Sequence, residues 1–356
     1  MVRSMNLLVV GTKFGSTYLE AATNNDHWDI AGIVARTPVS RRDVGRKFNV
    51  DKQCQFPSLD AAIENCRDLD AVVIATPNHL HYPMAKKVLD AGYHLILEKP
   101  IVETWHQAVD LVNRLDAQEG RKACVGQTLR GEIMIRMMAH YMNEGIIGKP
   151  EQAIFSCHWW WMDDPSKERN WRFRLPNMLL DDIGIHQLDE IRMLLGNRTC
   201  KRLFGMTCTP PSYPIETLNA TASGLLQMEG EVHVNYFSSM AARGRSEGWY
   251  GRIEIFGEKG SMLRESSGQP YVYLDGKKEP IGLDDEYGEN IDEVLPLVNF
   301  DKIPYILEDF YQAIKKNRAP VTDLHDNLNS HAMLLGMKES ARTGKPIDMQ
   351  ESFPMP

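Results

Sequence analysis

The feature that most constrains this sequence is an alternation, in its first third, of short apolar runs with stretches that have a helical spacing. The apolar runs are candidate strands at 7–10, 30–35, 71–75, 94–98 and 122–126. An amphipathic stretch at 81–92 stands between two of them and ends at Gly92, as a helix C-cap does. Strands alternating with helices at this spacing predict a doubly wound parallel sheet covered by helices.

The rhythm changes near residue 125. Longer alternating runs follow at 152–161, 221–240, 251–266 and 271–280, and the turns "MEGE", "GEKG" and "LDGK" join them as hairpins. Such a pattern predicts an antiparallel sheet. Two helical patterns, at 303–317 and 324–344, close the chain. Because 356 residues exceed what one core usually holds, we expect an α/β domain over 1–125 and an α+β domain over 126–356 with an open, mainly antiparallel sheet.

Charge and composition exclude several classes of function. A net charge of −8 argues against a nucleic-acid partner, which favours a basic face. No apolar run reaches the roughly 18 residues that span a bilayer, so no membrane association is expected. The apolar stretch at the N-terminus is too short for a signal peptide. Six cysteines without a C-x-x-C pair predict neither a disulfide framework nor a zinc site, and indicate a reducing cytoplasm.

The first candidate strand runs into "GTKFGS" (11–16), which differs from a dinucleotide-binding fingerprint. That fingerprint, G-x-G-x-x-G, lets the backbone approach a pyrophosphate. Here Lys13 stands where the second glycine belongs, and Ser16 stands where the third does. The segment is therefore either a degenerate phosphate turn or an ordinary turn from strand to helix.

Polar residues follow two further candidate strands, at the end where doubly wound sheets bind ligands. Thr76, Pro77 and Asn78 follow the strand at 71–75, and they are equally typical of a ligand-binding turn and of a helix N-cap. Glu98 and Lys99 follow the strand at 94–98. Because the next residue, a proline, fixes the exit path, this charged pair favours ligand contact over a surface salt bridge.

Asp182 and His186 are spaced i, i+4 in a helical pattern and so share one face. A carboxylate one turn from an imidazole orients the ring and raises its pKa, which suits proton transfer near neutrality. A solvated helix face explains the same spacing. The histidines and aspartates at 79, 81, 158, 163 and 164 make no full set of metal ligands, so no metal site is expected. No G-x-S-x-G hydrolase elbow is present.

In ordered combination these motifs resemble the glucose–fructose oxidoreductase/inositol dehydrogenase family, also called Gfo/Idh/MocA, over essentially the whole chain. The matching segments are "ATPNHLH", "EKP", "GIIGKP" (145–150), "NWRF" (170–173), "DIGIHQLDEIRMLLG", "IEIFGEKGSM" and "ESARTGKPI" (339–347). The resemblance implies an N-terminal Rossmann domain with a doubly wound parallel sheet and a C-terminal α+β domain. It also implies homo-oligomers, dimers or tetramers, that pair through the open sheet.

The resemblance implies a role for each matching position. Lys99 corresponds to the residue that holds cofactor and reacting hydroxyl, His186 to the general acid/base, and Asp182 to its positioning neighbour. The implied cofactor contacts, in chain order, are Gly11, Thr12, Lys13, Phe14, Gly15, Thr76, Pro77, Asn78, His81, Glu98, Lys99, Gln127, Trp171 and Arg172. On this interpretation "GTKFGS" is a degenerate fingerprint whose helix N-terminus faces the pyrophosphate, with Lys13 as a cation.

The chain departs from the family pattern after the second strand, where an acidic residue would hold an adenosine 2′-hydroxyl. Arg36, Thr37 and Arg41 stand there, which favours NADP(H), with NAD(H) still possible. An exposed basic loop is the alternative explanation. A second departure, "RLPNMLLDD" before Asp182, replaces a glycine-rich run and changes the expected substrate site.

The implied activity is hydride transfer between a nicotinamide and a hydroxyl or keto carbon of a sugar, glycoside or cyclitol, within carbohydrate metabolism. The tryptophans 159–161 suit either the apolar side of a sugar ring or ordinary packing. Three other functions remain open: a redox-neutral glycosidase of the same family, an imine or enone reductase, and a non-catalytic NADP-sensing regulator.

Overall fold

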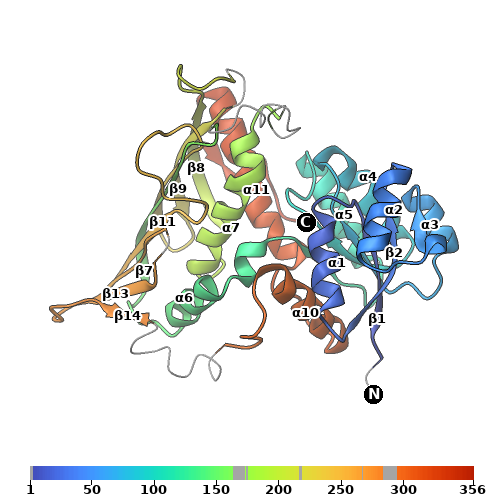
Figure 1. Cartoon of the computed structure of the whole chain (residues 1–356). Helices are drawn as coiled ribbons and strands as arrows, with labels where there is room; N and C mark the ends of the chain where they lie inside the picture. The colour runs from blue at the N-terminus through green and yellow to red at the C-terminus, as the bar shows by residue number, and fades with distance from the viewer. Residues whose placement is uncertain (1–2, 163–172, 174, 216–218, 267, 284–294) are drawn as a thin grey trace. The chain divides into compact units, whose positions relative to one another are not determined.

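The computed structural model describes residues 3–162, 173, 175–215, 219–266, 268–283 and 295–356 (Figure 1). The chain forms two compact units. Unit 1 contains residues 1–132 and 299–328 together with Pro356, and unit 2 contains residues 133–298 and 329–355. The first change of unit lies close to the expected boundary at 125. The return of 299–328 to unit 1 was not expected from the sequence.

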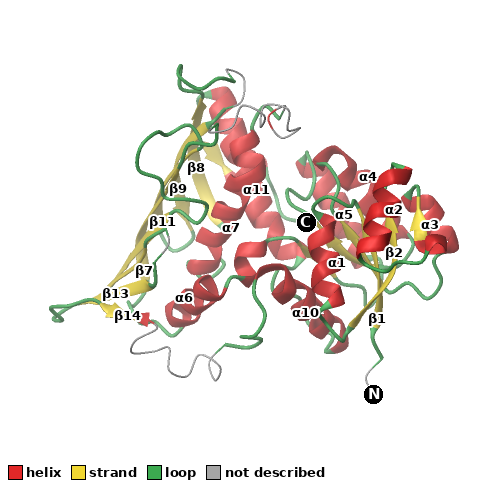
Figure 2. Cartoon of the chain, viewed as in Figure 1, coloured by secondary structure: helices red, strands yellow, loops and turns green. Residues whose placement is uncertain are grey.

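Unit 1 contains a parallel sheet of six strands in the order β3-β2-β1-β4-β5-β6. Figure 2 shows strands of this sheet in yellow and the helices around them in red. The strands are β1 (Met5–Val10), β2 (Trp28–Val34), β3 (Gln55–Phe56), β4 (Ala71–Ile74), β5 (His94–Leu97) and β6 (Ala123–Val125). The helices are α1 (Gly15–Thr23), α2 (Pro38–Lys47), α3 (Leu59–Asn65), α4 (His81–Asp90), α5 (Trp105–Asp116) and α10 (Lys302–Lys315), with short 3₁₀ turns η1 (Lys52–Cys54), η2 (Asn78–Leu80) and η3 (Thr128–Gly131). The predicted Rossmann fold is confirmed, and its strand order reverses between β1 and β4.

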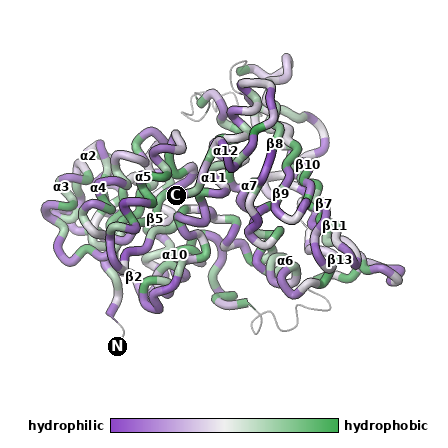
Figure 3. The backbone as a smooth tube through the Cα atoms, turned by 180° about the vertical axis from the view of Figure 1, so that it is seen from behind, coloured by the Kyte–Doolittle hydropathy of each residue, from purple (hydrophilic) through white to green (hydrophobic). Residues whose placement is uncertain are grey.

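Both faces of this sheet are buried, which is why its strands read as continuous apolar runs. Because side chains alternate along a strand, Leu8 and Val10 of β1 face a core shared with α3, α4 and α5. Leu7 and Val9 are equally buried and point to the other face. Figure 3 shows the tube beside the label β5 in green, the hydrophobic colour.

The segment 299–328 completes unit 1. The indole of Trp28 donates a hydrogen bond to the carbonyl of Leu307 on α10 (3.2 Å), and its ring stacks on Phe310. The backbone of β6 bonds to the same segment, since the Val125 amide donates to the carbonyl of Thr322 (2.8 Å). Residues far apart in the sequence therefore belong to one sheet-and-helix unit.

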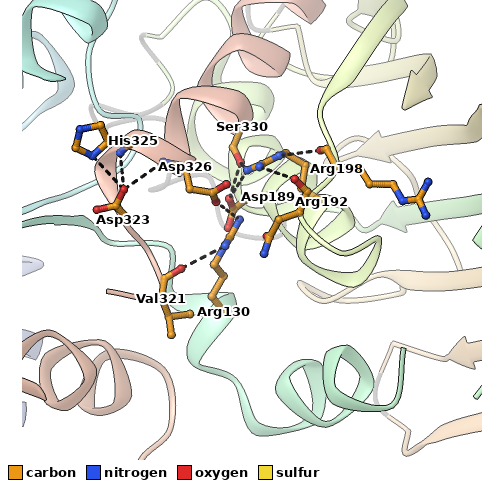
Figure 4. A network of polar contacts seen from close by, with 10 residues as sticks. Arg130, Asp189, Arg192, Arg198, Val321, Asp323, His325, Asp326 and Ser330 are labelled. Carbon is orange, nitrogen blue, oxygen red and sulfur yellow. Dashed lines mark hydrogen bonds and ion pairs between the residues drawn. The ribbon is translucent and has the colours of Figure 1, made fainter. Parts of the chain in front are cut away.

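His325, in the first turn of α11 (Leu324–Thr343), lies between two carboxylates. Its Nδ1 is 3.1 Å from Asp323, and its Nε2 is 2.8 Å from Asp116 of α5. Figure 4 shows the contact with Asp323. Hydrogen bonds to Asp323 and then Asp116 raise the pKa of His325 to about 9. The charged imidazolium therefore joins α5 to the start of α11 at neutral pH.

Unit 2 contains a nine-stranded sheet in the order β14-β13-β12-β11-β7-β10-β9-β8-β15. The strands are β7 (Pro150–His158), β8 (Cys200–Cys208), β9 (Thr221–Met228), β10 (Val232–Ser239), β11 (Arg252–Gly257), β12 (Gly260–Arg264), β13 (Pro270–Leu274), β14 (Ile281–Gly282) and β15 (Ile347–Asp348). All neighbours pair antiparallel except β7 and β10, which run parallel. The expectation of a mainly antiparallel sheet is confirmed.

One face of this sheet packs against helices. Unit 2 contains α6 (Ile133–Asn143), a π-helical turn η6 (Leu179–Gly184), α7 (Ile185–Leu194), most of α11, and α12 (Met349–Ser352). Gly205 of β8 and Gly224 of β9 make room for Met337 of α11, because a Cβ at either glycine would lie 2.9 Å from its sulfur. The missing side chains let α11 approach the strands closely.

Candidate functional site

Gly11 directly follows β1, at the point where the strand order of unit 1 reverses. Its φ is +95°, and a Cβ there would lie 2.3 Å from the carbonyl oxygen of Ala75, just beyond β4. Gly15 is packed in the same way, because its Cβ would lie 2.8 Å from Val9. In the fingerprint the third glycine supplies this close packing of helix on strand. Gly15 therefore takes over the role of the missing third glycine, and the Ser16 hydroxyl instead donates to the carbonyl of Thr12 (2.6 Å).

Helix α1 begins beside this turn without a side-chain cap. Phe14 is its N-cap residue and makes no capping hydrogen bond. The side chains of Lys13 and Phe14 are exposed. The first amide groups of a helix are the donors that bind phosphate oxygens, so the geometry fits a phosphate group although the sequence motif is incomplete.

A buried carboxylate lies where β5 ends. Glu98 is 5% exposed and accepts a hydrogen bond from the hydroxyl of Tyr18 on α1 (2.6 Å). Burial first, and then the Glu98 charge, raise the pKa of Tyr18 well above its usual value, so the phenol stays protonated and donates. A Cβ on Gly126 would lie 2.2 Å from the Glu98 carboxylate. Tyr18 was not predicted as a site residue. The only hint in the sequence was its polar hydroxyl on an otherwise apolar helix face.

Gln127, directly after Gly126, has a buried amide that is not satisfied. Its side chain is 1% exposed, and neither its nitrogen nor its oxygen has a hydrogen-bond partner among the residues that the structure describes. A buried amide without hydrogen bonds lowers the stability of the fold unless another group, such as a ligand, bonds to it. Gln127 was predicted to contact the cofactor. A polar ligand bound at this edge of the sheet would supply the missing hydrogen bonds, in keeping with that prediction.

The turn after β4 and the turn after β5 are joined by His81, the first residue of α4. Its ring is fully buried, with Nε2 2.8 Å from the carbonyl oxygen of Thr76 and Nδ1 2.8 Å from that of Pro100. The side chains around these turns, those of residues 76–78 and of Lys99, are partly exposed. We expected His81 itself to line the nicotinamide. Both of its nitrogens lie 2.8 Å from backbone carbonyl oxygens, and contact of the ring with the nicotinamide stays a prediction.

The three residues predicted to bind a 2′-phosphate differ in what they contact. The Thr37 hydroxyl caps α2 by accepting from the Ser40 amide (3.2 Å). The Arg41 guanidinium donates to the carbonyls of Ala35 (2.6 Å) and Arg36 (3.2 Å). The Arg36 side chain is exposed, and it forms no hydrogen bond or ion pair with any residue in the described part of the chain. Arg36 is therefore the cation of this group that remains for a ligand.

Asp182 and His186 lie in unit 2, on two different kinds of helix. Asp182 belongs to the π-helical turn η6, and His186 is the second residue of α7. The sequence predicted one uninterrupted helix over both. Its periodicity does not reveal the wider turn, and such turns are often found at functional sites. Gly184, between the two residues, is closely packed, because a Cβ there would lie 3.2 Å from the hydroxyl of Tyr236.

Polar contacts hold the residues that flank His186. On the η6 side, Lys338 of α11 forms an ion pair with Asp181 (2.9 Å). On the other side, the buried Gln187 accepts from the hydroxyl of Tyr236 (2.6 Å). Both helices are thus fixed in register around the candidate acid/base.

A second set of contacts fixes α7 one turn further along. Ser330 of α11 donates to Asp189 (2.5 Å) and accepts from Arg192 (2.9 Å), as Figure 4 shows. Glu190 pairs with Arg264 of β12 (2.5 Å), and both side chains are buried. Because buried ion pairs and hydrogen bonds are sensitive to geometry, these contacts restrict movement of the helix that carries His186.

Two groups of aromatic and basic residues singled out in the sequence remain to be placed. Trp171 and Arg172 lie outside the described residues. The tryptophans of the 159–161 run pack in an aromatic cluster: Trp159 stacks on Trp249 (5.8 Å between centroids), and the guanidinium of Arg243 lies 3.6 Å from the ring centroid of Trp160.

Across the parts of the chain that the structure describes, no three His, Cys, Asp or Glu side chains form a group able to hold a metal ion. In the same residues, no helix is long and apolar enough to cross a membrane.

Lys99 belongs to unit 1, whereas Asp182 and His186 belong to unit 2. That these three side chains meet at one reaction centre stays a prediction. Within unit 1, the carboxyl edge of a Rossmann sheet carries a glycine turn, an uncapped helix and an unsatisfied buried amide. These features define a dinucleotide-binding protein.

Comparison with known proteins identifies the family. Residues 5–127 match the oxidoreductase family with an NAD-binding Rossmann fold, and residues 135–263 match the Gfo/Idh/MocA C-terminal domain. The chain belongs to the Gfo/Idh/MocA family of oxidoreductases. Relatives named for their activity include two inositol 2-dehydrogenases and a 1,5-anhydro-D-fructose reductase, and the family model that residues 5–127 match is one of oxidoreductases.

Individual relatives are distant. Levoglucosan dehydrogenase of Pseudarthrobacter phenanthrenivorans is 29% identical over 45% of this chain and 41% of its own length, so the chain matches less than half of that relative. Inositol 2-dehydrogenase 1 of Paenarthrobacter aurescens is 25% identical over 78% of each chain. A solved inositol dehydrogenase homologue from Azotobacter vinelandii, complexed with NADH and myo-inositol, has a TM-score of 0.83 at 20% identity and covers 98% of each chain. That likeness shows the fold.

Proposed function

We propose that this protein transfers hydride between NADP(H), or less readily NAD(H), and a hydroxyl or keto carbon of a sugar, glycoside or cyclitol. The observation that carries the proposal is the buried polar edge of unit 1, where Gln127 has an unsatisfied amide beside the Glu98–Tyr18 pair. The names of the relatives, levoglucosan dehydrogenase and inositol 2-dehydrogenase, support this class of substrate.

The residues present fit a dinucleotide. Gly11 and the first amides of α1 would hold the pyrophosphate, Gln127 and the turn at 76–78 would contact the nicotinamide side, and Lys99 follows the same edge. A bound nicotinamide supplies the hydride acceptor or donor.

The chain's own residues would supply the proton chemistry. In the oxidative direction His186 takes the proton of the substrate hydroxyl, and in reduction it returns that proton. Asp182 orients the imidazole and the substrate. Lys99 stabilises the negative charge that develops on the substrate oxygen and fixes the position of the reacting carbon.

Cofactor preference depends on Arg36. Its exposed guanidinium follows β2, where a 2′-phosphate would lie, and a planar guanidinium binds phosphate in a bidentate manner. Arg36→Ala should weaken NADPH binding by at least about tenfold and change NADH binding little. Arg42→Ala is the matched control, because the Arg42 side chain pairs with Asp43 instead. Equal losses for both nucleotides in Arg36→Ala would contradict the preference.

The activity itself is tested with a panel of sugars, glycosides and inositols, with NAD⁺ and NADP⁺ and detection by nicotinamide absorbance. His186→Ala should abolish turnover and leave nucleotide binding largely intact, whereas the exposed His233→Ala should retain turnover. Unchanged turnover in His186→Ala would remove the acid/base assignment. Glycoside cleavage without added nucleotide and without net reduction would favour the redox-neutral glycosidase, and nucleotide binding without any turnover would favour a regulator.

We also propose that a second copy of the chain covers the open face of the unit 2 sheet. Ile154, Met206, Leu225 and Phe237 are exposed on four neighbouring strands, and the strand register places them on one face. Apolar residues grouped in this way are typical of an interface. Light scattering should show a dimer or tetramer, and Leu225→Lys should dissociate it; a monomeric wild-type protein would contradict this assembly.

A further inference from the structure

His81 connects two chain segments that no backbone bond connects. The last hydrogen bond between the β4 and β5 ends runs from the Glu98 amide to the carbonyl of Ile74 (3.0 Å). Beyond it, the chain after β4 continues to Thr76 and the chain after β5 continues to Pro100. The His81 ring lies 2.8 Å from the carbonyl oxygens of both residues.

The ring is well suited to hold both segments because it is rigid and enclosed. Its side chain is fully buried at the start of α4, so water does not compete for its nitrogens. A buried hydrogen bond is stronger than one in water and fixes its partners more firmly. The two carbonyls lie on opposite sides of one planar ring, and the spacing between the segments is therefore set by the imidazole itself.

The two contacts together require two N–H donors. A carbonyl only accepts, so each contact needs an N–H, and a neutral imidazole has one. Burial lowers the pKa of His81, the two carbonyls oppose that change, and the charges of Lys99 and His79 add to it. The neutral ring donates to one carbonyl at a time, and only the charged ring donates to both.

The linked segments carry the residues that Proposed function assigns to the nicotinamide side. Thr76, Pro77 and Asn78 form the first segment, and Lys99 immediately precedes Pro100 in the second. We propose that His81 is a positioning residue, which sets the spacing of these two segments and so preforms the nicotinamide end of the dinucleotide site. This inference rests on the proposed function, and it assigns His81 a role through the backbone and not through contact with the cofactor.

Substitutions separate the two arms of the link. His81→Leu removes both ring nitrogens at similar volume, so neither carbonyl can be bonded. The amide nitrogen of asparagine reaches the position of Nδ1 and that of glutamine the position of Nε2, so His81→Asn keeps only the Pro100 contact and His81→Gln only the Thr76 contact. The control is His94→Leu. His94 is also buried in unit 1, but it begins β5 at the opposite edge of the sheet and accepts from the Lys122 amide (3.1 Å).

The experiment measures dissociation constants for NADPH and NADH by fluorescence titration of the full-length protein, with melting temperatures recorded in parallel. His81→Leu should raise both dissociation constants by at least about tenfold, and each single-arm variant should give a smaller rise. His94→Leu should lower the melting temperature and leave the dissociation constants within about twofold of wild type.

The outcomes distinguish this inference from the proposed function. Wild-type affinity in folded His81→Leu would overturn the positioning role and leave the proposed function intact. If His81→Leu does not fold, wild-type affinity in both His81→Asn and His81→Gln would overturn it equally. A wild-type protein that binds neither nucleotide would overturn the proposed function and this inference together.

Discussion

His331, on α11, should make the protein lose stability in acid. Its side chain is fully buried, and neither ring nitrogen has a hydrogen-bond partner among the described residues. Burial, with a smaller contribution from the charge of Lys338, lowers the pKa of His331 to about 3. Folding therefore keeps the ring neutral at any pH at which the protein is normally handled.

The size of the effect follows from proton linkage. In the unfolded chain the histidine has a pKa of about 6.5, so the unfolded state binds a proton as the pH falls below that value and the folded state does not. Because the pKa of His331 is lower in the folded state, the folded state keeps its full stability at pH values above the unfolded-state pKa. It loses stability as the pH falls below that pKa. Between about pH 7.5 and about pH 5 the loss is about 2 kcal/mol, because the unfolded state is almost fully protonated at the lower pH.

The assay is urea unfolding at several pH values, monitored by tryptophan fluorescence. Most of the tryptophans belong to unit 2, the unit that contains His331. His331→Leu keeps a similar volume and removes the titrating group, so its stability relative to wild type should rise by about 2 kcal/mol between the two pH values. His233→Leu makes the same change at an exposed position on β10 and should leave the pH dependence unchanged. If wild type and His331→Leu lose stability in parallel, the buried ring does not titrate as described.

Three further predictions concern other contacts. His325→Gln should lower the melting temperature near pH 6, where the protonated imidazole pairs with two carboxylates and stabilises the fold. The difference from wild type should vanish above about pH 9, where the imidazole is neutral, and a difference that stays constant with pH would exclude the ion pairs as its cause. Gly126→Ala should displace the Glu98 carboxylate and weaken nucleotide binding by at least about tenfold, and unchanged binding in a titration would show that the site tolerates the Cβ. Lys338→Met should break the ion pair with Asp181 and lower kcat more than it raises the dissociation constant of the nucleotide, while Lys338→Arg should restore kcat; equal effects of both variants would contradict a role for the charge.

The fold could be predicted from the sequence where burial leaves a simple pattern. The parallel strands of unit 1 are buried on both faces and read as apolar runs, and the hairpins of unit 2 alternate. Strand β8 escaped prediction because "CKRLFGMTC" mixes charged and small residues. The two-residue β3 is too short to leave a pattern of its own.

The candidate site was predicted less completely, because its contacts join residues far apart in the sequence. The Tyr18–Glu98 hydrogen bond spans 80 positions, and nothing in either local sequence specifies the other partner. The link from His81 to two backbone carbonyls leaves no trace in residue types at all, since any residue provides a carbonyl. The π-helical turn before His186 changes hydrogen bonding and not hydrophobic spacing, which is why the pattern predicted one regular helix.

The return of residues 299–328 to unit 1 has a consequence for how the protein is made. During synthesis the first 132 residues leave the ribosome without α10, the helix that packs against Trp28 at the start of β2 and His94 at the start of β5. That helix follows only after about 170 further residues, which include all of unit 2's larger segment, have been translated. A gene fragment that stops at residue 132 would encode an incomplete nucleotide-binding unit with an uncovered apolar surface. A fragment for biophysical work should instead splice 299–328 onto the first segment through a short flexible linker.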